Sequence, residues 1–253
     1  MRYAGIDIGS RSIELVIIEN GEVTLTRQAD TGFDPVKSSE KIINETDYDV
    51  IMATGYGRNL FEISFDGETV TEIKAHARGA GYLFPEATTV LDIGGQDSKA
   101  IHMNPSGKVM KFEMNDRCAA GTGKFLEIMA TSLGFSIEEF GRAALEPEDL
   151  LEINSMCTVF AESEVTSLVA LGYNRKEIAK GLHHSIVKRA ASMINRVSKG
   201  DEIVFTGGVA KNPCMVHLLE DILQKRILVP EAPQMTGALG AALIAKEKQA
   251  NRR

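Results

Sequence analysis

The chain has 253 residues, of which 43% are hydrophobic and 25% charged, an ordinary globular composition with enough residues for two small lobes. Its net charge of −7 and its lack of a basic cluster argue against nucleic-acid binding, which needs lysine and arginine to neutralise phosphates. No apolar run approaches the roughly 20 residues that span a bilayer, and three cysteines suit a reducing cytoplasm better than a disulfide framework, so we expect a cytoplasmic protein that contacts no membrane.

The chain begins with three short apolar runs that predict an antiparallel meander. The first two, at 3–8 and 13–18, are separated by a turn that starts at Gly9. The third run follows Asn20-Gly21, a dipeptide that signals a hairpin when it stands between apolar runs. The next expected elements are a helix near 36–45, a buried strand at 48–53 and a helix at 69–82.

The opening of the chain is repeated in its middle. Residues 87–109 match residues 4–23, and Asp92 takes the place of Asp7 in the repeat. One duplication predicts two similar lobes rather than a solenoid of many units.

After the repeat the chain is mainly helical, and its strands and helices alternate as in α/β lobes. We place the first lobe at 1–85, with a C-terminal helix at 236–250 packing on it, and the second lobe at 86–235. The elements expected beyond the repeat are helices at 119–133, 136–143, 158–171 and 174–198, a strand at 202–208, a helix from about 212, a short strand at 227–230 and a helix from about 236.

Three glycine-rich turns, each directly after a predicted strand, carry the candidate chemistry. Glycine lets backbone N–H groups approach phosphate oxygens because no Cβ stands in the way, and an aspartate at a strand end can hold Mg²⁺ through its waters. One such turn alone is most often only a tight turn, but three in this order, with a duplication, favour nucleotide binding. The turns are Asp7 to Ser12, Asp92 to Ser98 and Thr206 to Val209.

The three turns resemble the first phosphate, second phosphate and adenosine segments of the superfamily of actin, hexokinase, acetate kinase and the chaperone ATPases. This resemblance implies an α/β protein of two ribonuclease-H-like lobes, the actin-like ATPase fold, with ATP in the interlobe cleft. It also implies catalytic or magnesium-binding roles for Asp7, Asp92 and Gln96. The residues that it implies for ATP contacts are Gly9, Ser10, Arg11, Ser12, Gly94, Gly95, Gln96, Gly207 and Gly208.

Two of the three cysteines lie in similar settings. Cys118 and Cys157 each precede a stretch of helical character, and a helix N-terminus lowers the pKa of a thiol and favours a negatively charged cluster. Two cysteines cannot complete the four-thiolate site of an iron–sulfur cubane, but a twofold dimer supplies four. From spacing alone the opposite reading, two small buried hydrophobes, is the commoner one, and Cys214 is expected to pack in this way.

Five segments spread along the chain carry a more specific resemblance: ATGYGR, LDIGGQDSKAI, NDRCAAGTGKFLE, CTVFAESEV and FTGGVAKN. They resemble the activators of 2-hydroxyacyl-CoA dehydratases and the ATP-binding subunits of benzoyl-CoA reductase, over about residues 3–246. The resemblance implies a homodimer whose interface holds one [4Fe–4S] cluster through Cys118 and Cys157 of both protomers. It also implies that ATP changes the angle between two cluster-bearing helices, and that a low-potential electron then passes to a partner iron–sulfur enzyme.

The first phosphate turn departs from this family, whose members usually read Gly-Ser-Thr-x-x-Lys. Here Arg11 replaces the threonine and Glu14 the lysine. Arg11 either contacts the phosphates through its planar guanidinium group, or it pairs with Glu14 on the hairpin and contacts no ligand.

The resemblance therefore predicts an ATPase coupled to electron transfer, with a reduced ferredoxin or flavodoxin as the donor, ATP and Mg²⁺ as cofactors, and no nucleic-acid partner. One alternative is a small-molecule kinase of the same superfamily, such as a sugar kinase, and another is a regulatory ATPase whose cysteines are structural. Anaerobically purified protein is brown in the first case and colourless in the other two.

A few further residues are open to two readings. Lys124 and Glu127 lie one helical turn apart. They either contact the ribose or adenine of a nucleotide or form an exposed ion pair. His76 and the pair His183-His184 lie in helical stretches without metal-ligand spacing, so we expect no metal there.

Overall fold

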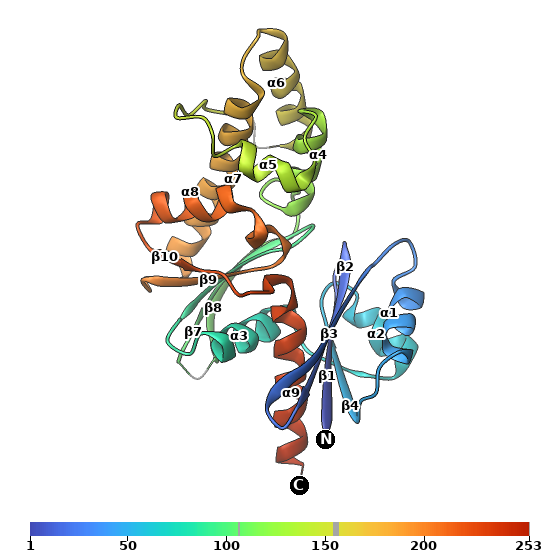
Figure 1. The fold of residues 1–253 in the computed structure, drawn as a ribbon. Helices are drawn as coiled ribbons and strands as arrows, with labels where there is room; N and C mark the ends of the chain where they lie inside the picture. Colours follow the sequence, from blue (N-terminus) through green and yellow to red (C-terminus); the bar gives the residue numbers. More distant parts are fainter. Residues whose placement is uncertain (106, 154–156, 253) are drawn as a thin grey trace. The chain divides into compact units, whose positions relative to one another are not determined.

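The fold is that of a computed structural model, which describes residues 1–105, 107–153 and 157–252 (Figure 1). The chain divides into two compact units. Unit 1 comprises Met1–Val90, Ile101–Lys111 and Pro230–Arg253, and unit 2 comprises Leu91–Ala100 and Phe112–Val229. The predicted lobe boundaries at residues 85 and 235 remain predictions. Within the described ranges, no helix is both long enough and apolar enough to cross a membrane.

The first sheet is built around the opening meander. Its strands are β1 (Arg2–Ile8), β2 (Ser12–Glu19), β3 (Glu22–Asp30), β4 (Val50–Thr54) and β5 (Glu68–Thr69), in the order β3-β2-β1-β4-β5. β1 pairs with β2 antiparallel and with β4 parallel. Asn20 and Gly21 have φ values of 55° and 93°, so both take the left-handed conformation that a two-residue hairpin turn requires.

The second sheet repeats this topology. Its strands are β6 (Thr89–Ile93), β7 (Ser98–Met103), β8 (Val109–Asn115), β9 (Glu202–Thr206) and β10 (Arg226–Leu228), in the order β10-β9-β6-β7-β8. In both sheets the spatial order is third, second, first, fourth and fifth strand. The two five-stranded sheets confirm the predicted α/β class, and their matching order explains the internal repeat.

The helices of unit 1 cover both faces of the first sheet. Figure 1 shows α9 on one side of the sheet and α1 and α2 on the other. Gly5 of β1 lets α9 approach closely, because a Cβ on Gly5 would lie 1.9 Å from the carbonyl oxygen of Ala238. These helices are α1 (Pro35–Asn44), α2 (Arg58–Phe65), α3 (Glu72–Leu83) and α9 (Thr236–Asn251), with a 3-10 turn η2 (Pro233–Met235) before α9.

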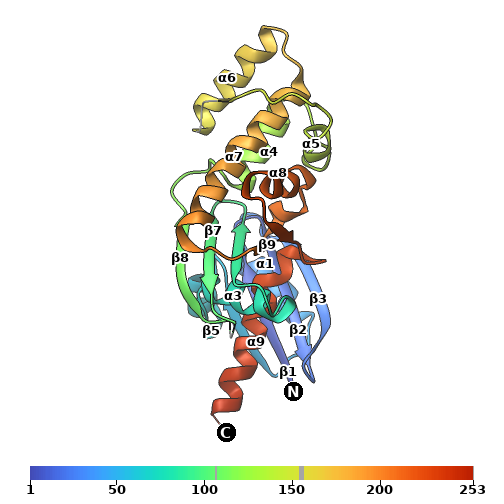
Figure 2. The same ribbon diagram turned by 90° about the vertical axis from the view of Figure 1, so that its left-hand side faces the viewer.

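Unit 2 carries the helices between the second hairpin and the last strands (Figure 2). Its core joins α4, α5, α7 and α8 to β9 through fully buried aromatic residues, Phe125, Phe140 and Phe205. The elements are α4 (Gly123–Ser132), α5 (Ile137–Ala143), α6 (Thr158–Ala170), α7 (Arg175–Val197), the 3-10 turn η1 (Gly208–Lys211) and α8 (Pro213–Leu223).

The sequence-based elements differ from the structure by more than two residues at three places. The helix expected at 69–82 begins only at Glu72, because Glu68 and Thr69 pair with β4 as a short strand. Helix α2 was not predicted; it buries only Phe61, which leaves a weak amphipathic pattern. The helix expected from 119 begins at Gly123, because Gly121 has a φ of +92° and so cannot continue a right-handed helix.

A buried histidine ties three helices of unit 2 together. His183 of α7 is fully buried, and its Nδ1 donates to the carbonyl oxygen of Ala179 over 2.7 Å. Its Nε2 accepts from Nδ2 of Asn212 over 2.9 Å, and its ring lies 4.7 Å from that of Phe140 in α5. Asn212 also caps α8 by accepting from the backbone N–H of Cys214 over 3.0 Å. Both ring nitrogens are thus used by a neutral imidazole.

This arrangement makes the stability of unit 2 depend on pH. Burial lowers the pKa of His183 from 6.5 to about 4. Between pH 6.5 and about pH 4 the unfolded chain therefore binds a proton at this histidine that the folded chain does not bind. Stability is full above pH 6.5 and falls as the pH drops towards 4, by about 2 kcal/mol between about pH 7.5 and about pH 5. Hydrogen exchange of α7 and α8 amides at both pH values measures the loss.

The control for this prediction is a second histidine of the same unit. His183→Asn removes the titrating ring and is expected to reduce the pH dependence, and His217→Asn, at a histidine whose side chain is 56% exposed, is the control variant. Equal pH dependence in the wild type and in His183→Asn would contradict the assignment.

Candidate nucleotide and cluster sites

The first glycine-rich turn joins β1 to β2 in unit 1. The N–H of Gly9 donates to the carbonyl oxygen of Ser12 over 3.0 Å, and the hydroxyl of Thr31 donates to the carbonyl oxygen of Gly9 over 2.8 Å. Asp7, at the end of β1, is only 6% exposed. The turn therefore holds the predicted residues Gly9 to Ser12 next to a buried carboxylate.

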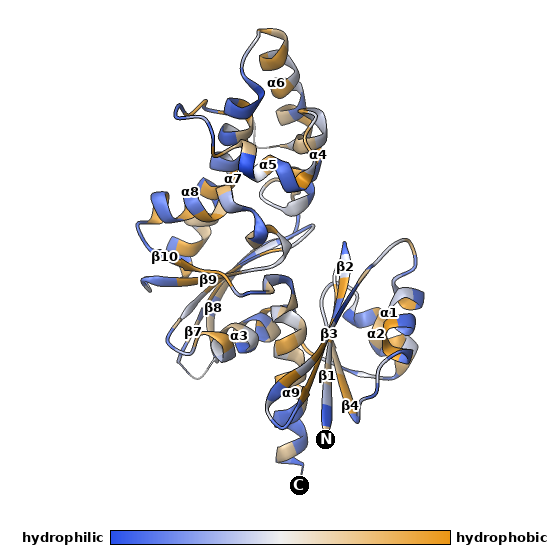
Figure 3. Ribbon diagram, viewed as in Figure 1, coloured by the Kyte–Doolittle hydropathy of each residue, from blue (hydrophilic) through white to orange (hydrophobic). Residues whose placement is uncertain are grey.

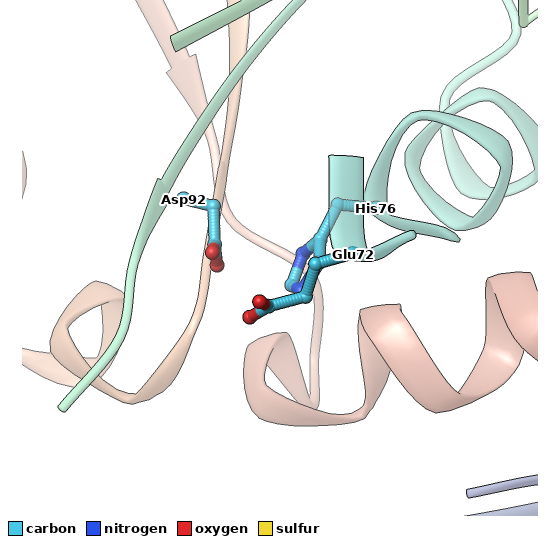
Figure 4. Close-up of side chains that lie close together, drawn as sticks. All are labelled: Glu72, His76 and Asp92. Carbon is cyan, nitrogen blue, oxygen red and sulfur yellow. The ribbon is translucent and has the colours of Figure 1, made fainter. Parts of the chain in front are cut away.

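Asp7 has two neighbours that the sequence analysis did not connect with it. Its Oδ2 lies 3.7 Å from Nε2 of His76, which extends from α3 together with Glu72 (Figure 4). Thr54 stands opposite Asp7 in the pairing of β1 and β4, and its fully buried hydroxyl has no hydrogen-bond partner among the described residues. An orphaned hydroxyl beside a buried carboxylate suits a site that a hydrated cation or a phosphate completes.

Glu14 and Arg11, the two departures from the family pattern, have separate partners. Glu14 is 4% exposed and accepts from the Ser12 hydroxyl over 2.5 Å and from Nε2 of Gln28 over 3.1 Å. Arg11 is 66% exposed and lies 3.6 Å from the carboxylate of Asp30. The ion pair with Asp30 is one that the sequence analysis did not consider, and a phosphate contact of Arg11 remains a prediction.

The second glycine-rich turn, in unit 2, contains a buried cation. Lys99 of β7 is 1% exposed, and its Nζ lies 3.2 Å from Oδ2 of Asp92 and 2.8 Å from Oδ2 of Asp97. Asp92, the last but one residue of β6 (Figure 4), is itself 2% exposed. A buried lysine is stable only when paired, so Lys99 fixes both carboxylates of the turn. The sequence analysis did not identify Lys99. The feature that could have revealed it is a lysine within a strand whose other residues are mostly buried.

The adenosine segment lies against the same carboxylate. The Thr206 hydroxyl donates to Oδ1 of Asp92 over 3.1 Å. Gly207 has a φ of +84°, and a Cβ there would lie 2.3 Å from the carbonyl oxygen of Ile93, so this position requires glycine. A Cβ on Gly208 would meet nothing within 4 Å, which leaves open space over the start of η1. The structure thus brings Asp92, Gly207 and Gly208 together, and their roles with magnesium and adenosine remain predictions.

The second phosphate turn is bonded directly to the start of α4. The N–H of Gly123 donates to the carbonyl oxygen of Gly94 over 2.9 Å, and the N–H of Lys124 donates to that of Gly95 over 2.8 Å. Gln96, at the tip of the turn, is exposed. Lys124 forms the exposed ion pair with Glu127, at 3.2 Å, that was one of its two readings.

The three cysteines differ in their surroundings. Cys157 is exposed at the N-cap position of α6, and Cys118 is partly exposed. Cys118 does not lie at a helix start, as the sequence suggested, but in the loop from β8 to α4, five residues before Gly123. Cys214 is buried, and burial raises the pKa of its thiol to about 12. The chain therefore has two accessible thiols and a third that is buried as expected, and the metal-binding roles of Cys118 and Cys157 remain predictions.

Two hydrogen bonds shape the loop that holds Cys118. Nδ2 of Asn115 donates to the carbonyl oxygens of Cys118 and Ala120 over 3.0 and 3.2 Å. Through the turn at Gly121 and the bonds of Gly123 and Lys124, this loop is continuous with the second phosphate turn.

Comparisons with known proteins agree over almost the whole chain. Residues 4–245 match the model of the BadF/BadG/BcrA/BcrD ATPase family. The activator of lactoyl-CoA dehydratase from Anaerotignum propionicum is 42% identical over 256 residues, covering 98% of both chains. Component A of the (R)-2-hydroxyglutaryl-CoA dehydratase of Acidaminococcus fermentans has a similar structure, with a TM-score of 0.92, 37% identity and 99% of both chains covered. The activator of the 2-hydroxyisocaproyl-CoA dehydratase of Clostridium difficile, solved with bound ADPNP, gives a TM-score of 0.89 at 37% identity, over 99% of this chain and 98% of that one.

Proposed function

This chain belongs to the BadF/BadG/BcrA/BcrD ATPase family, and we propose that it is an ATP-dependent activator that delivers a low-potential electron to a partner iron–sulfur enzyme. The matched relatives activate 2-hydroxyacyl-CoA dehydratases, so the proposed partner is an enzyme of that kind or one related to it. The observation that carries the proposal is the pair of accessible thiols, Cys118 and Cys157, in the unit that also holds the second phosphate turn.

The donor set fits one [4Fe–4S] cluster shared by two protomers. Cys118 and Cys157 of each chain provide the four thiolates of a cubane, and the buried Cys214 is left out. When bound, the cluster would supply one-electron chemistry at low potential. The chain's own task is to hold it at an interface, close to solvent and to the partner enzyme.

A homodimer would cover the exposed apolar side chains of α6. Of its thirteen residues only Ala161 and Val165 are buried, while Val159 and Phe160 are each 68% exposed. Figure 3 shows the apolar residues along this helix. Large apolar side chains grouped on one helix favour a protein contact, and α6 starts at Cys157, so pairing two copies would bring their thiols together.

ATP and Mg²⁺ fit the two glycine-rich turns. The backbone of Gly9 to Ser12 and of Gly94 to Gln96 would contact phosphates, and the open space over Gly208 would receive the nucleoside. Asp7 and Asp92 would hold Mg²⁺ through its waters. The orphaned hydroxyl of Thr54 supports the assignment at Asp7, and the open space over Gly208 supports the nucleoside site.

A short backbone path connects the nucleotide to the cluster ligand. A phosphate that moves Gly94 or Gly95 pulls on Gly123 and Lys124 through their hydrogen bonds. The start of α4 then displaces the loop that Asn115 fastens at Cys118. ATP can drive this change only if it binds the two arrangements with different affinity. We propose a reduced ferredoxin or flavodoxin as the donor and a reducing cytoplasm as the location.

We expect ATP to expose the cluster. Iron should be lost to bathophenanthroline faster with ATP than with ADP or without nucleotide, because movement of the Cys118 loop opens the interface that shields it. The measurement is the rate of coloured complex formation under anaerobic conditions, and equal rates in all three states would refute the coupling.

A glycine variant tests whether the proposed path carries this effect. A Cβ on Gly123 would lie 3.0 Å from the carbonyl oxygen of Gly94, so Gly123→Ala is expected to push α4 from the turn by a few tenths of an ångström and weaken the ATP effect while iron remains bound. The matched control is Gly81→Ala, whose Cβ would meet nothing closer than 3.7 Å.

A further inference from the structure

A pocket of about 440 Å³ opens beside the cysteine loop in unit 2. It lies between the end of β8, with Glu113 and Asn115, and the second half of α7, with Lys188, Arg189 and Arg196. The nucleotide turns, Asp92 to Ser98 and Thr206 to Val209, contribute nothing to its lining. The pocket is therefore separate from the nucleotide turns, and it shares Asn115 with the Cys118 loop.

The pocket is positively charged in a negatively charged protein. Arg196 is neutralised by Glu113, whose carboxylate it meets with Nε at 2.6 Å and with a second nitrogen. Lys188 has only a loose contact of 4.0 Å with Glu152, and both of these side chains are more than 60% exposed. In the described part of the chain, Arg189 has no hydrogen-bond or ion-pair partner. Lys188 and Arg189 thus leave about two positive charges on a chain of net charge −7.

This charge lies against the loop that holds Cys118. Asn115, in the wall of the pocket, donates to the carbonyl oxygens of Cys118 and Ala120. The side chain of Arg189 reaches the other end of the loop, since a Cβ on Gly121 would lie 3.3 Å from its Cδ. A molecule bound over the pocket would therefore contact residues that hold the Cys118 loop at both of its ends.

One exposed apolar side chain, Met114, lines the charged pocket, and a second, Phe112, precedes it by two residues on β8. Phe112 and Met114 are 51% and 39% exposed and lie on the same face of β8, the edge strand of its sheet. Apolar side chains flanked by cations are typical of the small interfaces that transient redox partners form. The remainder of an acidic protein repels an acidic partner, so this patch would guide such a partner to one place.

We propose that Phe112, Met114, Lys188 and Arg189 form the docking surface for a small acidic one-electron carrier that reduces the cluster. This inference rests on the proposed function. It adds where the electron donor binds and that the donor is negatively charged. The reaction moves one electron and no atoms: the carrier is oxidised by one electron, and the cluster held by Cys118 and Cys157 is reduced by one.

The test uses anaerobically purified protein and an acidic reduced ferredoxin. Lys188→Glu/Arg189→Glu is expected to slow reduction by ferredoxin at least tenfold at low ionic strength, because steering raises association rates by at least this factor. The difference should largely vanish at about 0.5 M salt, where charges are screened within a few ångströms. Reduction by the small cation methyl viologen should not be slowed. The affinity for oxidised ferredoxin, measured by titration calorimetry, should fall in parallel.

Two further variants make the test decisive. Lys188→Gln/Arg189→Gln removes the charge without reversing it and should give a smaller loss with the same salt dependence. Lys225→Glu/Arg226→Glu makes the same charge change beside and on β10, at the opposite edge of the sheet, and should leave the ferredoxin rate unchanged. Equal losses at both edges would show a net-charge effect, and dissociation of the dimer by the Lys188/Arg189 variants would assign the patch to the contact between copies; either result overturns the proposal. Protein without iron would instead refute the proposed function itself.

Discussion

Replacing Cys118 or Cys157 by serine is expected to remove the iron almost completely. A cubane needs four thiolates, and in a twofold dimer each replacement deletes two of them at once. Iron content should fall from about four per dimer to near zero, and the brown colour should be lost. Because the cluster would join the two protomers, dimerisation should weaken too. Iron analysis and sedimentation of anaerobically prepared protein measure both effects.

Cys214→Ser is the matched control, since Cys214 is the third cysteine of the same unit. Its side chain, near the start of α8, is fully buried, and burial raises the pKa of its thiol to about 12, so it offers no thiolate at neutral pH. This variant should keep its iron, with a modest loss of stability from burying a hydroxyl. Loss of iron in Cys214→Ser alone would show that the ligands are wrongly chosen. A colourless wild-type protein would favour a kinase or a regulatory ATPase.

Neutralising Asp7 or Asp92 is expected to lower ATP hydrolysis by about a hundredfold or more, because charge that stabilises a transferring phosphoryl group is worth this much. Asparagine keeps the shape of each side chain, which matters at Asp92, where Lys99 is buried against the carboxylate. The visible spectrum of the cluster should not change, since Cys118 and Cys157 belong to other segments. Phosphate release at saturating Mg·ATP, with the spectrum recorded on the same sample, tests both statements.

Two controls separate catalysis from stability in this experiment. Asp221→Asn removes a carboxylate that is 58% exposed in the same unit as Asp92, and it should leave hydrolysis unchanged. Removing one partner of a buried ion pair can cost about 3–5 kcal/mol, so thermal unfolding of Asp92→Asn must be measured too. Full activity in both Asp7→Asn and Asp92→Asn would mean that magnesium is held elsewhere.

The sequence predicted those parts of the fold that depend on local pattern. The two hairpins follow from alternating apolar runs, from Asn20-Gly21 and from the repeat of Asp7 at Asp92, and the sheets have matching strand orders. The start of α4 was placed too early, because helix-forming alanines precede Gly121 and a pattern does not reveal its positive φ. The consequence was that Cys118 was assigned to a helix terminus although it lies in a loop.

The residues that were missed are those whose role depends on distant partners. His76 lies on α3, far along the chain from Asp7, and no spacing connects them. Lys99 was passed over although LDIGGQDSKAI was read as a motif, because burial of its ammonium group appears only when β6 and β7 pair. The positive charge of Lys188 and Arg189 was not recognised for a similar reason. Its importance depends on the Cys118 loop, which packs against these side chains only in the folded structure.

The interleaving of the two units determines the order in which the chain can be assembled during synthesis. Unit 2 ends at Val229, so all of its residues have been translated before α9 is made. Unit 1 contains the first strands but cannot complete its core until Pro230–Arg253 has been made. Val16 and Ile18 of β2 are covered by Ala238, Leu239 and Leu243 of α9. Domains generally fold as they leave the ribosome. The cysteine-bearing unit is therefore expected to fold before the first sheet, whose β2 residues stay uncovered until α9 has been made.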